Sequence, residues 1–202
     1  MKKSDITKQK ILQAAEQAFA EKGLYGARVD GISELAGVNK RMIYAYFGNK
    51  KELYMAVLDM VYGRIAEREQ AVLSQDADCV ELIKKYIDSS FFYLYENQTF
   101  VKIVLWENLN EAKYLKESVG KQTKTASFDV LRSVMRKGVE QGVFRDDIDE
   151  DELIISTQMM SYSYFSNIYT MTYMMDKDFF CEDEMKKRCA HITDMILRYI
   201  MK

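Results

Sequence analysis

The sequence predicts an all-α protein in which an N-terminal three-helix helix-turn-helix domain is joined to a larger helical domain. Proline is absent and only nine of the 202 residues are glycine, which suits long helices and disfavours a turn-rich β fold. Hydrophobic residues make up 48% of the chain, enough for a packed core. Apolar residues recur three or four positions apart along most of the chain, which is the period of an amphipathic helix.

The first helix is predicted over about residues 5–22. Ile11, Ala15 and Phe19 recur there at helical spacing. Gly23 follows directly, and a glycine in the left-handed conformation is a common helix end. We therefore expect the first helix to end at this glycine.

Two short helices follow, separated by a turn that begins with glycine. They are predicted over residues 29–36 and 40–47, and Asn39 is a suitable N-cap for the second of them. Two such helices joined by a short turn form a helix-turn-helix unit, whose second helix is built to enter a major groove of DNA. The side chains expected to face inward are Val29, Ile32, Leu35 and Ala36, then Ile43 and Phe47.

The chain downstream of Gly48 is predicted to be helical throughout. Asn49 is expected to cap the next helix, and Glu52 stands in the position of a capping box. We expect the helix-turn-helix domain to span residues 1–52 and the larger domain to span residues 53–202. The later helices are expected over about 50–74, 79–96, 98–109, 120–141, 149–175 and 182–201.

Charge is distributed unevenly between these two domains. Residues 1–52 carry ten Lys or Arg against six Asp or Glu, and residues 53–202 carry nineteen against twenty-five. A basic domain on an acidic one favours an anionic partner for the first. A chance distribution of solvated charge is the alternative, because charge asymmetry alone is only a prior.

Four of the cations lie at predicted helix starts within GVNKRMIYAYFGNKKEL. Lys40 and Arg41 open one helix, and Lys50 and Lys51 open the next. The helix dipole disfavours a cation in the first turn by roughly 0.3–1 kcal/mol. A phosphate bound near either helix start would remove that conflict, whereas the alternative is that these side chains are simply solvated.

The stretch GISELAGVNKRMIYAYFGNKKELYMAVL resembles the DNA-binding segment of the TetR family of bacterial transcriptional regulators. The resemblance covers residues 6–58 and includes the first helix with its terminal glycine. Farther along, the chain is similar to the family only in length and all-helical pattern. The residues that match the family pattern are Ile32, Ala36, Gly37, Val38, Tyr44, Tyr46, Phe47, Asn49, Lys50 and Leu53.

The resemblance implies a set of DNA-binding positions. Arg41 and Met42 stand where the family commonly has a small residue and Ser or Thr, so the operator cannot be taken from a relative. Arg41 has the chemistry for a bidentate contact with guanine. The predicted groove-facing residues are Lys40, Arg41, Met42, Tyr44 and Ala45, the predicted phosphate-binding residues are Tyr46 and Lys50, and Arg28 and Val29 complete the DNA-binding set.

Two helices of the larger domain are predicted to form a homodimer interface. The helix at 149–175 is apolar on nearly all sides and must be covered on several of them. The last helix repeats apolar residues at alternating spacings of four and three, which is a coiled-coil-like seam. A four-helix dimer interface is what the resemblance implies, and a seam inside one chain is the alternative. The expected interface residues are Leu153, Met160, Tyr164, Met185, Cys189, Ile192, Ile196 and Tyr199.

Methionine and aromatic side chains concentrate in the same domain. Residues 155–180 hold five Met and seven Phe or Tyr, and such side chains suit an adaptable pocket for a small apolar or aromatic effector. A plain core is the alternative for each of them. The resemblance implies an effector pocket somewhere in this domain, and the candidate ligand-binding residues are Tyr93, Trp106, Met159, Tyr162 and Phe165.

Other classes of protein find little support in the sequence. Three scattered cysteines and a single histidine lack zinc-site spacing, and neither a G-x-G-x-x-G nor a P-loop stretch is present. We therefore expect no catalytic residue, no metal, no cofactor and no enzymatic activity. No apolar run suits a signal peptide or a membrane span, and odd, scattered cysteines fit a reducing compartment. The protein is therefore expected in the cytoplasm without a membrane partner.

The sequence thus predicts a ligand-responsive transcriptional regulator that binds DNA. It would bind a palindromic operator in double-stranded DNA as a homodimer, since paired recognition helices read two half-sites. A small-molecule effector would release it, and repression by obstruction of the promoter is what the resemblance implies. The alternative is a DNA-binding regulator controlled by a protein partner, without a small-molecule ligand.

Overall fold

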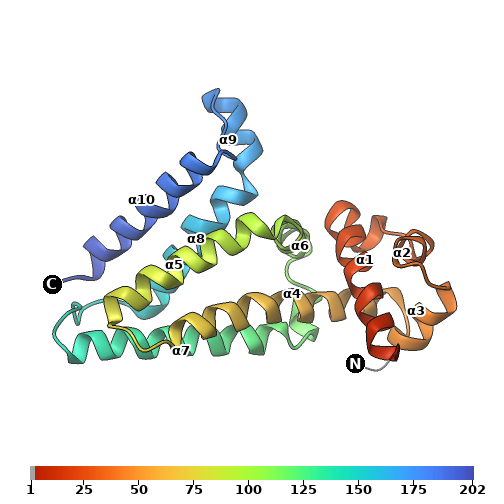
Figure 1. Cartoon of the computed structure of the whole chain (residues 1–202), viewed down its shortest axis with the longest axis horizontal. Coiled ribbons are helices and arrows are strands. Elements are labelled where there is room, and N and C mark those ends of the chain that lie inside the picture. Colours follow the sequence, from red (N-terminus) through yellow and green to blue (C-terminus); the bar gives the residue numbers. More distant parts are fainter. Residues whose placement is uncertain (1–2) are drawn as a thin grey trace. The chain divides into compact units, whose positions relative to one another are not determined.

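The computed structural model describes residues 3–202 as a chain of helices that divides into two compact units (Figure 1). The head unit contains residues up to Arg64 together with Gln98–Thr123, and the body unit contains Ile65–Asn97 with Lys124–Lys202. The predicted functional division at residue 52 stays a prediction. The helices are α1 (Lys3–Gly26), α2 (Val29–Ala36), α3 (Lys40–Phe47), α4 (Lys50–Leu73), α5 (Cys79–Glu96), α6 (Gln98–Leu109), the 3-10 turn η1 (Leu115–Glu117), α7 (Gly120–Glu140), α8 (Glu150–Ser166), α9 (Ile168–Met175) and α10 (Glu182–Ile200).

The all-α prediction is confirmed, and the bounds of α2, α3, α5 and α6 are as expected. The single helix expected over 149–175 is wrong, because the chain leaves helical geometry at Asn167 and forms α8 and α9 instead. The Asn167 side-chain amide donates to the Ser163 carbonyl oxygen at 3.0 Å. Asparagine favours helix ends because its side chain competes for backbone groups in this way.

Helices α2 and α3 depend on packing, since helices of eight residues are marginal by themselves. Ile32 on α2 and Ile43 on α3 are fully buried. Leu35 was expected to face inward and is instead 61% exposed. The buried stripe of α2 is narrow, being made by Val29, Ile32 and Ala36, and Leu35 lies beyond its edge.

The turns around α3 have the expected chemistry. Gly37 ends α2 in the left-handed conformation, with φ at 63°. The Asn39 side chain accepts a hydrogen bond from the Arg41 backbone N–H at 2.9 Å, and the Asn49 side chain accepts one from the Glu52 backbone N–H at 3.0 Å. Both predicted N-caps are therefore confirmed, and they fix where α3 and α4 begin.

Gly23 interrupts α1 one turn before its end, with φ at 62° and ψ at 179°. That region of backbone conformation is essentially restricted to glycine. The Trp106 indole of α6 lies over this glycine, so that a Cβ there would be 2.8 Å from Trp106 Cδ2. The indole N–H also donates to the Ala20 carbonyl oxygen at 3.2 Å. Glycine is thus needed twice, for its conformation and for the approach of α6.

Two buried glutamates tie α6 to other helices of the head unit. Glu16 on α1 accepts hydrogen bonds from Arg64 on α4 at 2.7 Å and from Thr99 on α6 at 2.6 Å. Glu107 on α6 accepts one from the Tyr54 hydroxyl on α4 at 2.9 Å. Burial raises the pKa of Tyr54, and the neighbouring Glu107 charge raises it further.

A third buried glutamate holds the body unit together. Glu69 on α4 has no exposed surface. It pairs with the Lys124 ammonium on α7 and accepts hydrogen bonds from Ser127 at 2.6 Å and from Ser90 on α5 at 3.1 Å. Burial lowers the pKa of Lys124, although the Glu69 charge opposes that shift. Three helices thus meet at one carboxylate.

The rest of the body core is mainly apolar, with Thr157 and Ser161 as buried polar residues. Its largest fully buried side chains include Tyr86 and Phe91 on α5, Phe165 on α8 and Phe144. The Phe91 and Phe165 rings are in contact, with their centroids 4.8 Å apart and their planes tilted by 55°. None of the helices described here is both long and apolar enough to cross a membrane.

Replacing Lys124 by methionine is expected to lower the free energy of unfolding by about 3–5 kcal/mol, because Glu69 would stay buried without its cation. The double variant Lys124→Met/Glu69→Gln leaves no buried charge and should recover more than half of that loss. Urea unfolding followed by circular dichroism measures both. Lys137→Met, at an exposed position of the same helix, is the control, and a Lys124→Met loss no larger than the control's would contradict the assignment.

Candidate nucleic-acid interface and effector groove

Helix α3 presents one face to solvent and buries the opposite face. Arg41, Tyr44 and Ala45 are exposed, whereas Ile43 is buried. Residues three and four apart share a helix face, so the three exposed side chains lie side by side. Lys40 is partly exposed one turn from Tyr44. The structure therefore brings together four of the five predicted groove-facing residues, and the fifth, Met42, is half-buried at the edge.

Acidic residues of the chain already neutralise two of the cations at the helix starts. Lys40 pairs with Asp30 of α2 at 2.6 Å, and the hydrogen bond to Asp30 raises the pKa of Lys40. Lys51 pairs with Glu117 at 2.6 Å. Arg41 makes no ion pair with another residue in the range 3–202. Among the cations that open α3 and α4, the guanidinium of Arg41 is therefore the most available to a ligand.

Lys50 lies differently from the other cations. Its ammonium donates to the Ala27 carbonyl oxygen at 3.1 Å and to the Tyr25 carbonyl oxygen at 3.5 Å. Tyr25 lies in the last turn of α1 and Ala27 follows its end, so Lys50 holds the turn that leads into α2. Its predicted contact with phosphate stays a prediction, and it would share the ammonium with these two carbonyls.

The remaining predicted DNA-binding residues differ in exposure. Arg28 is exposed at the start of α2. Val29 is buried, so its side chain is not available for a contact with DNA. Tyr46 is half-buried, with the Lys8 ammonium 5.7 Å from its ring centroid. Lys8 was not among the predicted DNA-binding residues. The only indication in the sequence was its positive charge on the first helix.

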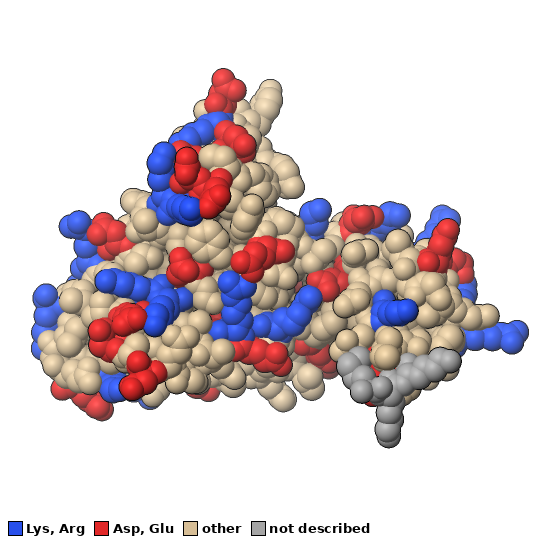
Figure 2. Space-filling model, in the orientation of Figure 1, with Lys and Arg blue, Asp and Glu red and all other residues tan. Residues whose placement is uncertain are grey.

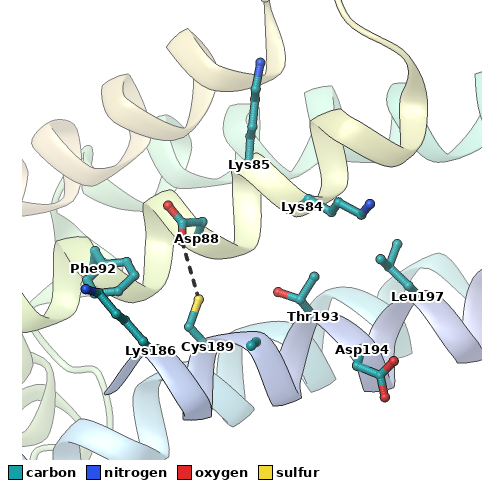
Figure 3. Close-up of a pocket in the computed structure, with 10 residues that line it drawn as sticks. Lys84, Lys85, Asp88, Phe92, Lys186, Cys189, Thr193, Asp194 and Leu197 are labelled. Carbon is teal, nitrogen blue, oxygen red and sulfur yellow. Dashed lines mark hydrogen bonds between the residues drawn. The ribbon is translucent and has the colours of Figure 1, made fainter. Parts of the chain in front are cut away.

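A groove of about 550 Å³ lies between α5 and α10 of the body unit (Figure 3). Phe92 and Leu197 supply apolar surface, and Lys84 makes no ion pair with another residue of the described chain. Two other lysines of the rim are already paired, Lys85 with Glu81 at 2.7 Å and Lys186 with Glu182 at 2.5 Å. A site of this kind suits a small, largely apolar ligand that carries one polar or anionic group.

Cys189 lies in this groove, where its surroundings disfavour the thiolate form. Its thiol donates to Asp88 Oδ1 at 3.8 Å, and burial followed by the Asp88 charge raises the pKa of Cys189 to about 12. A thiol reacts as its thiolate, and the raised pKa of Cys189 makes that form scarce at neutral pH. Within residues 3–202, no three His, Cys, Asp or Glu side chains are placed to hold a metal ion.

The five predicted ligand-binding residues do not meet in one cavity. Trp106 belongs to the head unit, where it packs on Gly23. Tyr93 and Phe165 are buried in the body core, while Met159 is exposed and Tyr162 half-buried. None of the five lines the α5–α10 groove. Composition does not distinguish a pocket wall from a packed core, and the effector site stays a prediction.

The predicted dimer residues divide in a similar way. Leu153, Met185, Cys189, Ile192 and Ile196 are buried within one chain, so the seam on α10 is an internal one, the alternative that the sequence left open. Tyr199 is exposed, and Met160 and Tyr164 are half-buried. The large apolar side chains that α8 and α10 leave exposed are Ile155, Met159, Met195 and Tyr199.

Comparison with known families matches both parts of the chain. Residues 11–57 match the model described as bacterial regulatory proteins, tetR family. Residues 80–196 match a model described as the tetracyclin repressor-like C-terminal domain. Together the two matches cover most of the helices in both units.

Individual relatives agree with the family models. The HTH-type transcriptional repressor NicS of Pseudomonas putida is 30% identical over 196 residues, which is 96% of this chain and 92% of that protein. The HTH-type transcriptional repressor SCO4008 of Streptomyces coelicolor is 30% identical over 150 residues, 74% of this chain and 73% of that one.

Solved structures share the fold at lower identity. The fatty acid degradation regulator FadR of Bacillus halodurans superposes with a TM-score of 0.73 at 21% identity, covering 95% of this chain and 94% of that one. The ketosteroid transcriptional regulator KstR2 of Mycobacterium tuberculosis gives 0.71 at 19% identity, with 96% and 95% covered.

Arg41→Ala is expected to lower discrimination between the preferred DNA sequence and a single-base variant by about 1–3 kcal/mol, because a bidentate guanine contact would be lost. Lys50→Ala should instead weaken binding to all sequences alike and reduce the salt slope by about one, as loss of a phosphate contact does. Fluorescence anisotropy on both DNAs over a salt series measures these effects.

Lys102→Ala, at an exposed position of α6, is the matched control and should change neither quantity. A change of base preference on Lys50→Ala with overall affinity unaltered would show that the two roles are assigned wrongly.

Proposed function

Because the chain belongs to the TetR family of bacterial transcriptional regulators, we propose that it is a ligand-responsive repressor that binds a palindromic operator as a homodimer. The observation that carries the proposal is the exposed face of α3, where Arg41, Tyr44 and Ala45 lie side by side. Side chains in this position of a helix-turn-helix unit contact base edges in the major groove. As a regulator of chromosomal genes, it would act in the cytoplasm.

The ion pairs at the helix starts are compatible with DNA binding. The Lys40 and Asp30 side chains are 43% and 72% exposed, and an exposed pair of this kind is worth about 0–1 kcal/mol. A phosphate can therefore replace Asp30 at little cost. Asp30 meanwhile screens the cation in free protein, which limits binding to unrelated anions.

The homodimer would form through the exposed side chains of α8 and α10. Ile155 and Met159 on α8 and Met195 and Tyr199 on α10 expose apolar surface that one chain leaves uncovered. A twofold interface places the same surface of each copy against the other. These four exposed residues replace the buried α10 residues that the sequence suggested for the dimer interface. The two helices proposed for the interface, α8 and α10, are unchanged.

The effector is proposed to be a small apolar or aromatic molecule that binds in the α5–α10 groove. The volume of about 550 Å³ lies within the roughly 300–1,000 Å³ typical of ligand sites. Lys84 would pair with an acidic group on such a molecule. The relatives that share this fold include a fatty acid degradation regulator and a ketosteroid transcriptional regulator. Fatty acids and ketosteroids are largely apolar compounds. The protein would release DNA if the effector binds more tightly to a conformation of the protein that binds DNA weakly.

The test is fluorescence anisotropy with DNA from upstream of the gene and with scrambled DNA of the same length. Selective binding with a steep salt dependence is expected, and titration with a panel of aromatic and aliphatic acids should release the DNA. Equal, weak binding to both DNAs over the whole salt series would contradict the proposal.

A substitution in the α5–α10 groove tests whether the effector binds there. Ala190→Trp places an indole in the α5–α10 groove and should abolish release while DNA affinity stays within about twofold, since surface substitutions usually change stability by less than 0.5 kcal/mol. Ala126→Trp, at an exposed position of α7, is the control. Release that survives Ala190→Trp would place the effector elsewhere.

A further inference from the structure

Helix α9 exposes five large apolar side chains at the end of the body unit, where α8 turns back toward α10 (Figure 1). Tyr169, Met171, Tyr173, Met174 and Met175 are between 42% and 89% exposed. Residues 153–175 contain no charged residue. Tyrosine and methionine without charge are typical of the centre of a protein interface rather than of a solvated helix.

Contacts with the segment between α9 and α10 hold α9 in place. The Tyr164 hydroxyl donates to the Phe179 carbonyl oxygen at 2.7 Å, and the Tyr169 and Phe180 rings lie 5.3 Å apart. Lys177 pairs with Glu184. In Figure 2 charged atoms gather on one side of this end of the body unit and leave uncharged surface beside them. The exposed side chains of α9 are thus presented on an ordered helix.

A second feature lies at the opposite end of the same helix pair. A groove of about 440 Å³ runs between α8 and α10 and is lined by Leu153, Ser156, Met160, Met195 and Tyr199. These residues belong to the first eleven residues of α8 and the last turns of α10, whereas α9 begins after the end of α8. The 17 residues of α8 span about 25 Å at 1.5 Å per residue. No residue of α9 lines this groove, so the α9 arm does not fill the groove of its own chain.

We infer that α9 of one copy inserts its apolar side chains into the α8–α10 groove of a second copy. A twofold axis through the middle of the α8–α10 pair exchanges the two ends of that pair. Each arm would then face the groove of the other copy, so the contact is made twice, as an isologous interface requires. The inference rests on the proposed homodimer and identifies the surfaces that hold it together.

Charge favours a second copy over the other partners of this protein. The arm has no cation for a phosphate backbone, which dominates contacts with DNA. The groove is apolar apart from Glu152 and Ser156, so it matches a neutral arm of Tyr and Met side chains. The exposed Ile155 and Met159 continue the apolar surface along α8 between the arm and the groove.

Disulfide cross-linking tests the contact in the full-length chain. In a Cys181→Ser background, which removes the exposed thiol, Tyr173→Cys marks the arm and Ser156→Cys marks the groove. With copper–phenanthroline and oxygen as the oxidant, an equal mixture of the two single variants should give a linked dimer on non-reducing gels after subunit exchange. Mass spectrometry should identify the peptide that joins residues 156 and 173.

Each single variant alone should remain unlinked. Linking of Tyr173→Cys to itself would overturn the inference in favour of contact between the two arms. Absence of any link, in a protein that sediments as a dimer, would overturn the arm-in-groove contact and leave the proposed homodimer standing. A wild-type protein that sediments as a monomer at micromolar concentration would overturn both.

Charge reversal of the surface gives an independent measurement. Tyr173→Asp/Met174→Asp should raise the dissociation constant of the dimer at least about tenfold, as expected where side chains carry interface energy. Leu109→Asp, at a site on α6 that is 74% exposed, is the matched control and should leave it unchanged. Circular dichroism confirms that each variant is folded, and equal dissociation constants for the two variants would contradict the inference.

Discussion

A carboxylate that is taken out of water must be paired or hydrogen-bonded, and this requirement fixes how α4 is packed. The chain buries three glutamates that interact with α4. Glu16 is held by Arg64, Glu107 is held by the Tyr54 hydroxyl, and Glu69, itself on α4, is held by Lys124. Since these contacts join α4 to α1, α6 and α7 in turn, α4 cannot shift against those helices without leaving a buried charge unsatisfied.

This packing bears on how an effector signal would travel. Helix α4 contributes to both units, with Tyr54 and Arg64 in the head and Glu69 in the body. Ser90 of α5 donates to Glu69, and α5 is also one wall of the groove proposed for the effector. A ligand that displaced α5 from α10 would therefore act on the carboxylate that positions α4.

Local signals in the sequence were sufficient for the two N-caps and for the bounds of α2, α3, α5 and α6. Asn39 and Asn49 act as N-caps through contacts within three residues, so their effect is visible in the sequence itself. The exposed face of α3 followed from the burial of Ile43 on its other side. The ion pair between Lys40 and Asp30 joins two helices, and no local pattern indicates which acid meets which cation.

The candidate sites in the larger domain were predicted less well, because periodicity marks a buried face without saying what covers it. The seam of α10 has dimer-like spacing, but Met185, Ile192 and Ile196 are covered within the chain. The methionine and aromatic residues of 155–180 were interpreted as one pocket-forming run. Asn167 divides that run, and its two parts have different surroundings.

The break at Asn167 decides what those side chains do. Before it, Phe165 packs on Phe91 in the body core. After it, Tyr173 and Met174 of α9 are exposed, although the composition of the chain hardly changes. Covering that surface would be favourable at about 25 cal/mol per Å² of apolar area, and no α9 residue lines the α8–α10 groove of its own chain. The free energy of covering α9 is therefore available to association rather than to folding. The helix end at Asn167 thus separates the apolar residues that form the core from those that are free to form an interface.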